Sequence, residues 1–311
     1  MPGALGVDGV LRIDKPRGPT SHDVVASVRR ALGQRSVGHA GTLDPMATGL
    51  LVVMAGEATK LSAHLSGDDK EYDAEVLFGA ETDTLDAEGI VTARAPDGAP
   101  PPGEAEVASA LAAMTGPLRQ VPPAVSAIKV DGVPLHARAR RGEVVEVPPR
   151  DVVLHEATLR WVRADPPSCG LSLRVSKGFY VRSFARDLAR ALGTLGHLGA
   201  LRRTRSGLLA GDGAREGAAL LAAGRGDAGA RAAVRAALEG WSFAESWMPV
   251  RRVGDDAVRE LGFGRPVSID ETGERAVLVL GPDGAAVCVG AEGGGVLRVA
   301  RGIVRGATVG C

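Results

Sequence analysis

One loop, at residues 38–51, constrains this chain more than any other segment. Its sequence GHAGTLDPMATGLL places a single carboxylate, Asp44, among three glycines, two threonines and a proline, and an apolar run follows. Glycine permits backbone angles that are closed to other residues, while Pro45 fixes the backbone directly after Asp44. The loop is therefore predicted to hold Asp44 in a defined position. Asp-Pro is also a common opening of a helix or turn, and from this loop alone a simple cap is favoured over a catalytic role.

Hydrophobic periodicity predicts a mixture of strands and helices. Strands are expected at residues 9–13, 50–54, 72–78 and 171–175, the last running on into KGFYVR. Helices are expected after Thr20 or Ser21 until Gly33, at residues 104–114, and along an apolar stripe that ends near Gly193. Regular βαβ alternation is missing from this order. We therefore predict an α+β fold with a mixed sheet.

The composition changes after Trp247. The runs RAVLVLG, AAVCVGA and GVLRVARG are short, apolar and separated by Gly and Asp turns, at the spacing of a small β-barrel. Before them, residues 216–240 are rich in Ala and predict helical packing. We therefore place a domain boundary near residue 248, with domains at 1–247 and 248–311.

Charge is unevenly distributed although the formal net charge is zero. A neutral chain is not a generic polycation that coats nucleic acid. Residues 62–106 are strongly acidic, whereas residues 174–205 carry an excess of arginine that ends in Arg202, Arg203 and Arg205. Such a basic block is either a solvated face or a surface for RNA phosphates.

Cysteine and histidine spacing gives no support for a disulfide framework or a metal site. The three cysteines, Cys169, Cys288 and Cys311, are far apart and form no C-x-x-C pair, and the six histidines lack H-x-x-x-H spacing. No apolar run approaches the length that crosses a bilayer, and the N-terminus lacks the pattern of a signal peptide. We therefore expect a metal-free protein of the cytoplasm that does not contact membranes.

Several motifs together resemble one enzyme family. Besides the Asp44 loop they are DKPRGPTSHDVV (14–25), GEATKL (56–61), KEYDAEVLFGAETDTLDAEG (70–89), PPAVSAIKVDGVPLHARARRG (122–142), KGFYVRSFARDL (177–188) and LRRTRSG (201–207). In this order they resemble the TruB family of bacterial tRNA pseudouridine-55 synthases. The resemblance is strong over about the first 210 residues and weak over the last sixty.

The resemblance implies a fold and a reaction. The fold is that of the pseudouridine synthases, with a largely antiparallel sheet flanked by helices and loops and a C-terminal barrel like a PUA domain. The reaction is the isomerisation of a uridine in the T loop of tRNA to pseudouridine, after the base has been flipped into a pocket. It implies no cofactor, no required protein partner and a monomer.

The resemblance also implies roles for individual residues. Asp44 corresponds to the catalytic carboxylate, Arg182 to an arginine paired with it, and Tyr72 to the tyrosine that stacks on the target base. Contacts to the substrate are expected from the following residues: His39, Tyr180, Leu201, Lys15, Lys60 and Arg202. The segment 127–141 resembles an insertion that binds tRNA, although His136 stands where the family commonly has Tyr.

The residues themselves leave alternatives for Arg182. A carboxylate held away from water needs a positive partner to stay ionised, and a guanidinium fork fixes its orientation better than a lysine. Strand alternation across KGFYVR places Tyr180 and Arg182 on one face. In the competing interpretation Arg182 pairs with Asp187 at the surface, and Tyr180 belongs to the core.

Three competing functions have to be weighed. An RNA chaperone that only binds and folds tRNA needs none of Asp44, Tyr72 and Arg182. A relative that depends on guide RNA shares the Asp44 loop, but KGFYVR and PPAVSAIK favour the stand-alone bacterial type. A phosphotransferase would need a second acid near Asp44, and position 46 is Met. The route of the isomerisation stays open among attack at C1', attack at C6 and a glycal-type path.

Overall fold

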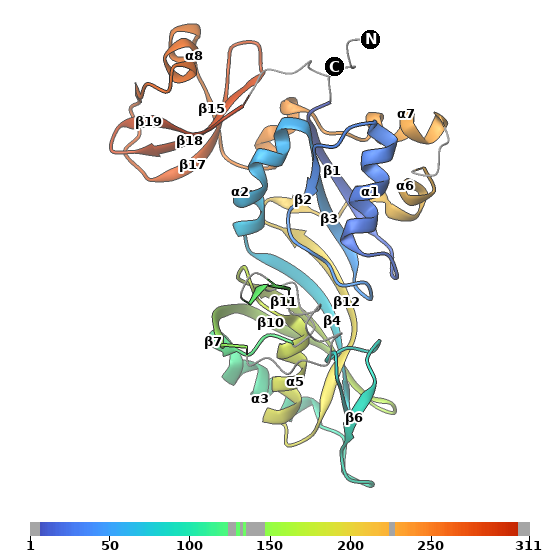
Figure 1. Ribbon diagram of the computed structural model, residues 1–311. Coiled ribbons are helices and arrows are strands. Elements are labelled where there is room, and N and C mark those ends of the chain that lie inside the picture. The colour runs from blue at the N-terminus through green and yellow to red at the C-terminus, as the bar shows by residue number, and fades with distance from the viewer. Residues whose placement is uncertain (1–6, 124–128, 131–132, 135–146, 224–227, 304–311) are drawn as a thin grey trace. The chain divides into compact units, whose positions relative to one another are not determined.

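The computed structural model describes residues 7–123, 129–130, 133–134, 147–223 and 228–303. These residues form two compact units (Figure 1). The first comprises residues 1–68 and 205–311, and the second comprises residues 69–204.

Strand pairing around β1 and β3 organises the first unit. Strand β1 (Gly9–Lys15) pairs antiparallel with β3 (Thr48–Ala55). The short β2 (Val37–His39) pairs antiparallel with β3, and β14 (Arg215–Glu216) runs parallel to β1. Nearly all side chains of β3 are buried, as expected for its apolar run. The predicted strands at 9–13 and 50–54 are thus confirmed.

Helix α1 (Ser21–Leu32) starts and stops where its sequence predicts. The Thr20 hydroxyl accepts a hydrogen bond from the Asp23 backbone, and the Asp23 carboxylate accepts one from the Thr20 backbone. This reciprocal cap satisfies two backbone donors that a helix start leaves unpaired. Gly33 ends the helix with φ +68°, a left-handed conformation that favours glycine.

The first unit continues with short helices. They are the 3-10 helix η1 (Gly56–Leu61), α2 (Ser62–Gly67), α6 (Gly217–Ala223), α7 (Ala228–Ala236) and the 3-10 helix η2 (Trp241–Ser246). Helices α6 and α7 confirm the helical packing that the Ala-rich segment 216–240 predicts. Strand β13 (Leu209–Ala210) pairs with the end of β12 (Gly196–Ser206), a strand that crosses the boundary between the units.

A five-stranded curled sheet ends the first unit. Its strands, in the order β15-β17-β18-β19-β16, are Val250–Arg252, Arg275–Leu280, Ala286–Gly293, Val296–Gly302 and Val267–Ser268, and helix α8 (Asp255–Gly262) accompanies them. Leu261 of α8 packs with Val277, Val279 and Leu297. Trp247 belongs to a cluster that also contains Val52 and Leu278. The boundary at residue 248 stays a prediction.

An antiparallel sheet forms the second unit. Its order is β12-β4-β11-β10-β7, with β4 at Lys70–Phe78, β11 at Pro167–Val175, β10 at Arg150–Ala164 and β7 at Gly116–Gln120. Helices α3 (Glu104–Met114) and α5 (Val181–Ala191) contact each other, and they pack on β10 and β4 respectively. Two small hairpins are β5 (Ala80–Thr82) with β6 (Val91–Arg94), and β8 (Lys129–Val130) with β9 (Val133–Pro134). The predicted α+β fold is confirmed.

The strand expected across KGFYVR is wrong. Strand β11 ends at Val175, and α5 already begins at Val181 with Tyr180 as its N-terminal cap. The helical apolar stripe extends back from Leu188 through Phe184 to Val181, all buried, and it overrides the local strand pattern. Tyr180 and Arg182 therefore do not share a strand face. Arg182 lies in the first turn of a helix.

Three further findings concern membrane contact, metal binding and a cysteine. Among the described residues, no helix is long and apolar enough to span a membrane. The same part of the chain contains no group of three or more His, Cys, Asp or Glu side chains placed to hold a metal ion. The Cys169 thiol is buried in β11, and this burial raises its pKa to about 12.

Candidate functional site

The Asp44 loop is anchored through its backbone on both sides of the carboxylate. The Ser21 hydroxyl donates to the Leu43 carbonyl at 3.1 Å and accepts from the Leu43 N–H at 2.9 Å. The Pro45 carbonyl accepts from the Gly18 N–H at 2.9 Å. A tight turn follows, in which the Ala47 N–H donates to the Asp44 carbonyl. A turn does open at Asp44, as the cap interpretation holds, but no helix follows it.

Lys15 provides another anchor for this loop. It is fully buried, and its ammonium donates to the carbonyls of Pro16, Pro19 and Pro45 at 2.9, 2.8 and 3.2 Å. A buried ammonium is stable only when its donors are satisfied. These bonds join the end of β1 to the residue that follows Asp44. Lys15 thus has a structural role, and the contact to RNA expected of it stays a prediction.

His39 and Lys60 also lie in the first unit. His39 ends β2, is half-buried, and approaches the His22 ring edge-on, with centroids 6.2 Å apart. Lys60 donates to the Gly302 carbonyl at 2.9 Å and forms an ion pair with Glu57. The charge of Lys60 is therefore engaged within the protein, and its proposed role at RNA stays a prediction.

Arg182 of the second unit is buried against Asp86. The side chains of Arg182 and Asp86 are 7% and 8% exposed, and their closest N and O atoms lie 3.5 Å apart. The same guanidinium nitrogen donates to the Thr84 carbonyl at 3.0 Å. Asp187 pairs with Arg186 at 2.8 Å, so the interpretation of Arg182 as a surface partner of Asp187 is wrong. Asp86 and the Thr84 carbonyl, both in the turn that follows β5, therefore fix the position of Arg182.

The Asp86 carboxylate also organises its own turn. One oxygen accepts from the Thr84 hydroxyl at 2.7 Å and from the Glu88 N–H at 3.1 Å. Leu85, between them, has φ +61°, which is uncommon for a residue other than glycine. Such a conformation persists only where its surroundings enforce it.

Backbone groups of strand β12 help to hold this turn in place. The Leu198 N–H donates to the Leu85 carbonyl at 3.0 Å, and the Ala87 N–H donates to the Leu198 carbonyl at 2.9 Å. The Thr82 hydroxyl closes the turn by donating to the Asp86 carbonyl at 2.7 Å. The segment TDTLDAEG is thus a rigid turn built around Asp86.

Sequence reasoning missed Asp86 and Gln120. Asp86 looked like one of many acids in an acidic stretch, and the only available signal was the hydroxyl and glycine residues around it. Gln120, at the end of β7, is buried and holds the cap of α5 from both sides. Its side chain accepts from the Tyr180 N–H at 2.9 Å and donates to the Tyr180 carbonyl at 3.3 Å.

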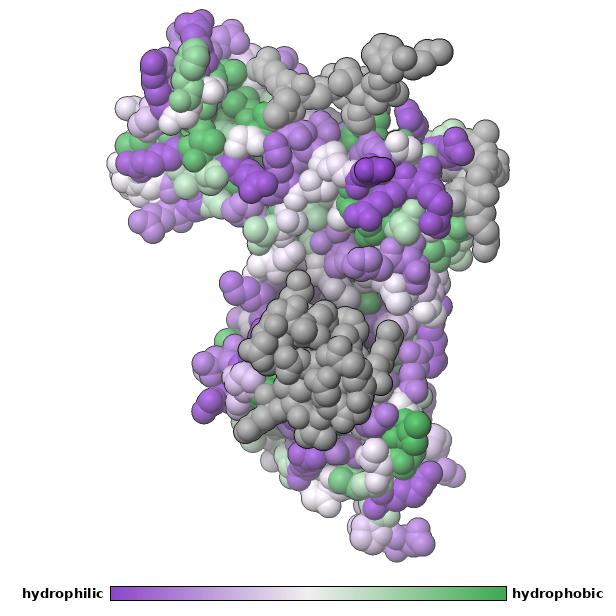
Figure 2. All heavy atoms as spheres, in the orientation of Figure 1, coloured by the Kyte–Doolittle hydropathy of each residue, from purple (hydrophilic) through white to green (hydrophobic). Residues whose placement is uncertain are grey.

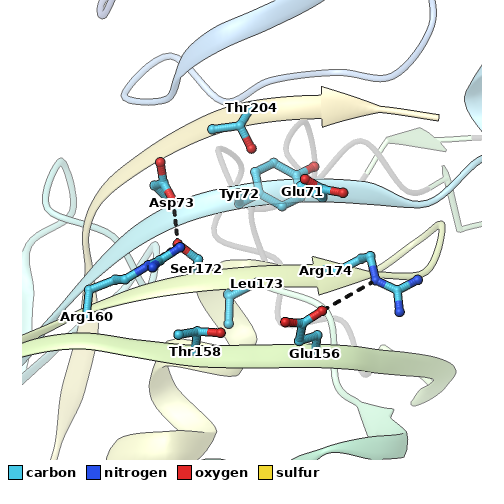
Figure 3. Close-up of a pocket in the computed structure, with 10 residues that line it drawn as sticks. All are labelled: Glu71, Tyr72, Asp73, Glu156, Thr158, Arg160, Ser172, Leu173, Arg174 and Thr204. Atoms are coloured by element: carbon cyan, nitrogen blue, oxygen red, sulfur yellow. Dashed lines mark hydrogen bonds and ion pairs between the residues drawn. The ribbon is translucent and has the colours of Figure 1, made fainter. Parts of the chain in front are cut away.

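Tyr72 lies on β4 beside a polar pocket of about 240 Å³ (Figure 3). Asp73 accepts from the Ser172 hydroxyl at 2.7 Å, and Ser172 accepts from Arg160 at 2.8 Å. Tyr72 is half-buried and pairs with Leu173 across the sheet. An aromatic ring in this position is available for stacking without being a core residue.

The other predicted residues of the second unit differ in exposure. Leu201 is buried in β12 and Arg202, next to it, is exposed. Arg203 is buried, so it is not a surface cation like Arg202. His136 and most of the segment 127–141 lie outside the described residues.

The site residues thus fall into two groups by position in the chain. Asp44, His39, Lys15 and Lys60 belong to the first unit, and Tyr72, Tyr180, Arg182, Leu201 and Arg202 belong to the second. Chemically, the first group offers a carboxylate on an anchored loop. The second offers a guanidinium in a fixed orientation and aromatic rings.

Comparison with known proteins identifies the family. A family model described as TruB family pseudouridylate synthase (N terminal domain) matches residues 29–181. The tRNA pseudouridine synthase B of Arthrobacter sp. (strain FB24) is 40% identical over 304 residues, covering 94% of this chain and 95% of that protein. That of Thermobifida fusca (strain YX) is 52% identical over 206 residues, covering 64% of this chain and 70% of that protein.

Solved structures agree on the fold. An H/ACA ribonucleoprotein bound to a substrate RNA containing 2'-deoxyuridine aligns with a TM-score of 0.69 at 20% identity, covering 98% of this chain and 92% of that one. The archaeal box H/ACA Nop10-Cbf5 complex aligns with a TM-score of 0.66 at 21% identity, covering 96% of this chain and 84% of that one. At these identities the likeness shows the fold alone. The 40% identity to a tRNA pseudouridine synthase B over nearly the whole of both chains shows more: the chain belongs to the TruB family of pseudouridylate synthases.

Proposed function

We propose that this protein isomerises uridine 55 in the T loop of tRNA to pseudouridine. The names of its relatives support tRNA as the substrate. The observation that carries the proposal is the Asp44 loop, which Lys15, Gly18 and Ser21 anchor on both sides of the carboxylate. Further parts of the proposal are a monomer that acts in the cytoplasm without a protein partner, a metal or a cofactor.

The reaction needs a carboxylate in a fixed place. The bond between C1' and N1 breaks and a bond between C1' and C5 forms, while C5 loses a proton and N1 gains one, so the atoms balance. An ionised Asp44 serves each open route: it attacks C1', attacks C6, or stabilises positive charge at C1' while a proton leaves C2'. Because the loop is anchored by hydrogen bonds on both sides of Asp44, little reorganisation is needed when the substrate arrives.

Arg182 and Tyr72 complete the proposed chemistry. A guanidinium aligned by Asp86 and the Thr84 carbonyl keeps one orientation and favours an ionised carboxylate beside it. Tyr72 stacks on the extruded uracil, and its hydroxyl relays a proton. His39, Tyr180 and Leu201 are proposed to contact the base.

RNA is recognised by other surfaces in this proposal. Arg202 is exposed and suits a phosphate. Residues 248–311 act as a PUA-like supporting surface for tRNA, while every residue assigned to catalysis precedes Gly207. Unpaired RNA loops are a common target of such proteins, because their bases can be splayed out and stacked on aromatic rings.

The proposal is tested with unmodified tRNA transcripts. The protein is incubated with a transcript that carries uridine 55 and with a matched transcript that carries cytidine there, and pseudouridine is mapped along both. We expect one modified position, in the first transcript only. Binding of both transcripts without any pseudouridine would instead favour an RNA chaperone.

A further inference from the structure

A second pocket, of about 380 Å³, lies in the first unit. It is bounded by the end of α1, by β2 and by η1. Its lining includes the side chains of Arg29, Arg35, Ser36, His39, Thr59 and Ser62. None of the described residues that line it is acidic. Figure 2 shows hydrophilic side chains gathered over α1, whose last turn contributes Arg29.

The two arginines of this pocket differ from others in the protein. Many arginines are neutralised by a carboxylate: Arg12 by Glu239, Arg190 by Glu81, Arg252 by Glu245 and Arg259 by Asp256. Within the described part of the chain, neither Arg29 nor Arg35 makes such an ion pair. Uncompensated cations in a concave site favour an anionic ligand.

Arg29 is also held in place. One of its terminal nitrogens donates to the Val37 carbonyl at 2.7 Å, which fixes the guanidinium against β2. The hydroxyls of Ser36 and Thr59 donate to the Gly56 carbonyl, at 3.1 and 2.7 Å. These two hydroxyls therefore already donate their hydrogens within the protein. The guanidinium groups, with their planar forks, are the cationic donors that this lining offers to an anion.

The position of the pocket suggests which anion it takes. Gly38 and His39 line it, and the same two residues begin the loop that carries Asp44. A strand of RNA whose uridine reaches Asp44 brings its backbone phosphates past this loop. Arginine forks match the geometry of phosphate oxygens.

We infer that Arg29 and Arg35 bind a backbone phosphate of the RNA strand whose uridine enters the site. This inference rests on the proposed function and adds a subsite to it. The pocket sets the register of the strand relative to Asp44, and it takes no part in bond breaking. Binding should depend on it, and the chemical step at saturating RNA should not.

The test measures affinity for a T stem-loop RNA over a range of salt concentrations. We use the full chain with Arg29→Gln, Arg35→Gln and both changes together. The matched control is Arg30→Gln, which removes the same charge from the neighbouring position of α1 but does not line the pocket. We expect each pocket variant to raise Kd by about tenfold. Each should also lower the log–log salt slope by about one, with the control unchanged.

A chemical change in the RNA sharpens the test. Single uncharged methylphosphonate linkages are placed in turn along the strand around the target uridine. One linkage should weaken binding by the wild type, and the same linkage should have no further effect on the double variant. This nonadditivity is the signature of a direct contact.

Each outcome has a clear consequence. Salt slopes of the pocket variants that equal the slope of Arg30→Gln would overturn the inference, even if the wild type modifies tRNA normally. A lowered single-turnover rate at saturating RNA would also overturn it, because it assigns these arginines to binding only. Arg35 makes no side-chain hydrogen bond or ion pair within the described residues, so Arg35→Gln tests the inference without a cost in folding. If the wild type forms no pseudouridine, the proposed function itself fails.

Discussion

Asp44 and Asp86 both lie in short loops, yet the two loops are held in opposite ways. The Asp44 loop is fixed through main-chain groups of Leu43 and Pro45, and Asp44 is half-buried. In the other loop the Asp86 carboxylate itself is the anchor, because it accepts from Thr84 and Glu88 and faces Arg182. A carboxylate that holds its own turn serves the fold. A carboxylate whose loop is held by others can serve a reaction.

The largest expected effect is the loss of stability in Asp86→Ala. This change removes the Asp86 carboxylate that faces the buried Arg182, and with it the acceptor for the Thr84 hydroxyl. Breaking a buried ion pair costs about 3 to 5 kcal/mol, so the free energy of unfolding in urea should fall by that amount. The control Asp187→Ala removes the partly exposed partner of Arg186 and should cost about 1 kcal/mol or less. Equal losses in the two variants would refute the anchoring role of Asp86.

Arg182→Lys should have the next largest effect, on the reaction. Lysine keeps the charge but cannot contact Asp86 and the Thr84 carbonyl with a planar fork. We expect a loss of roughly 3 kcal/mol in transition-state stabilisation, which is more than a hundredfold in the single-turnover rate. A rate like that of the wild type would show that the orientation of the guanidinium is unimportant.

Lys15→Met tests the backbone anchoring of the Asp44 loop. The substitution keeps the aliphatic stem but removes a charged donor from three carbonyls. We expect a loss of about 2 to 3 kcal/mol in unfolding free energy, with the chemical step slowed more than RNA binding is weakened. Lys60→Met, which loses a single carbonyl contact and one ion pair, is the comparison and should lose about half as much or less. A wild-type rate of the chemical step in Lys15→Met would show that the reaction does not depend on this anchoring of the Asp44 loop.

The smallest effect concerns Glu292, a structural carboxylate in the C-terminal sheet. Burial alone raises its pKa, but hydrogen bonds from Arg251 at 2.6 Å and Arg275 at 2.7 Å outweigh this and lower the pKa below its usual value. A carboxylate whose pKa is lowered by folding stabilises the protein at pH values above its unfolded-state pKa. This stabilisation is lost as the pH falls through its folded-state pKa.

The measurement is the melting temperature as a function of pH. Wild type should be more stable than Glu292→Gln at neutral pH, and the difference should shrink below about pH 4.5. A difference that stays constant from pH 7 to pH 3 would mean that the Glu292 pKa is not lowered by folding.

The sequence predicted the elements that depend on local pattern. Alternation identified β4, helical spacing and the Thr20 cap identified α1, and composition located the C-terminal strands. KGFYVR was misassigned because a short apolar alternation fits a strand as well as the start of a helix. Only the tertiary packing of Phe184 and Leu188 decides between them.

The candidate site was predictable only in part. The Asp44 loop is visible in the sequence because glycines and a proline surround one acid. The buried roles of Asp86 and Lys15 are not visible, since each depends on partners far along the chain: Asp86 faces Arg182, and Lys15 reaches Pro45. Spacing within a segment carries no information about such pairs.

The assignment of Asp44 to the reaction is tested by removing its carboxylate. Asp44→Ala is compared with wild type for tritium release from tRNA labelled at C5 of uridine, under single-turnover conditions, with tRNA binding measured in parallel. We expect release to be abolished, while tRNA affinity and the melting temperature stay close to those of the wild type. Release at the wild-type rate by Asp44→Ala would contradict the assignment of this carboxylate to the reaction.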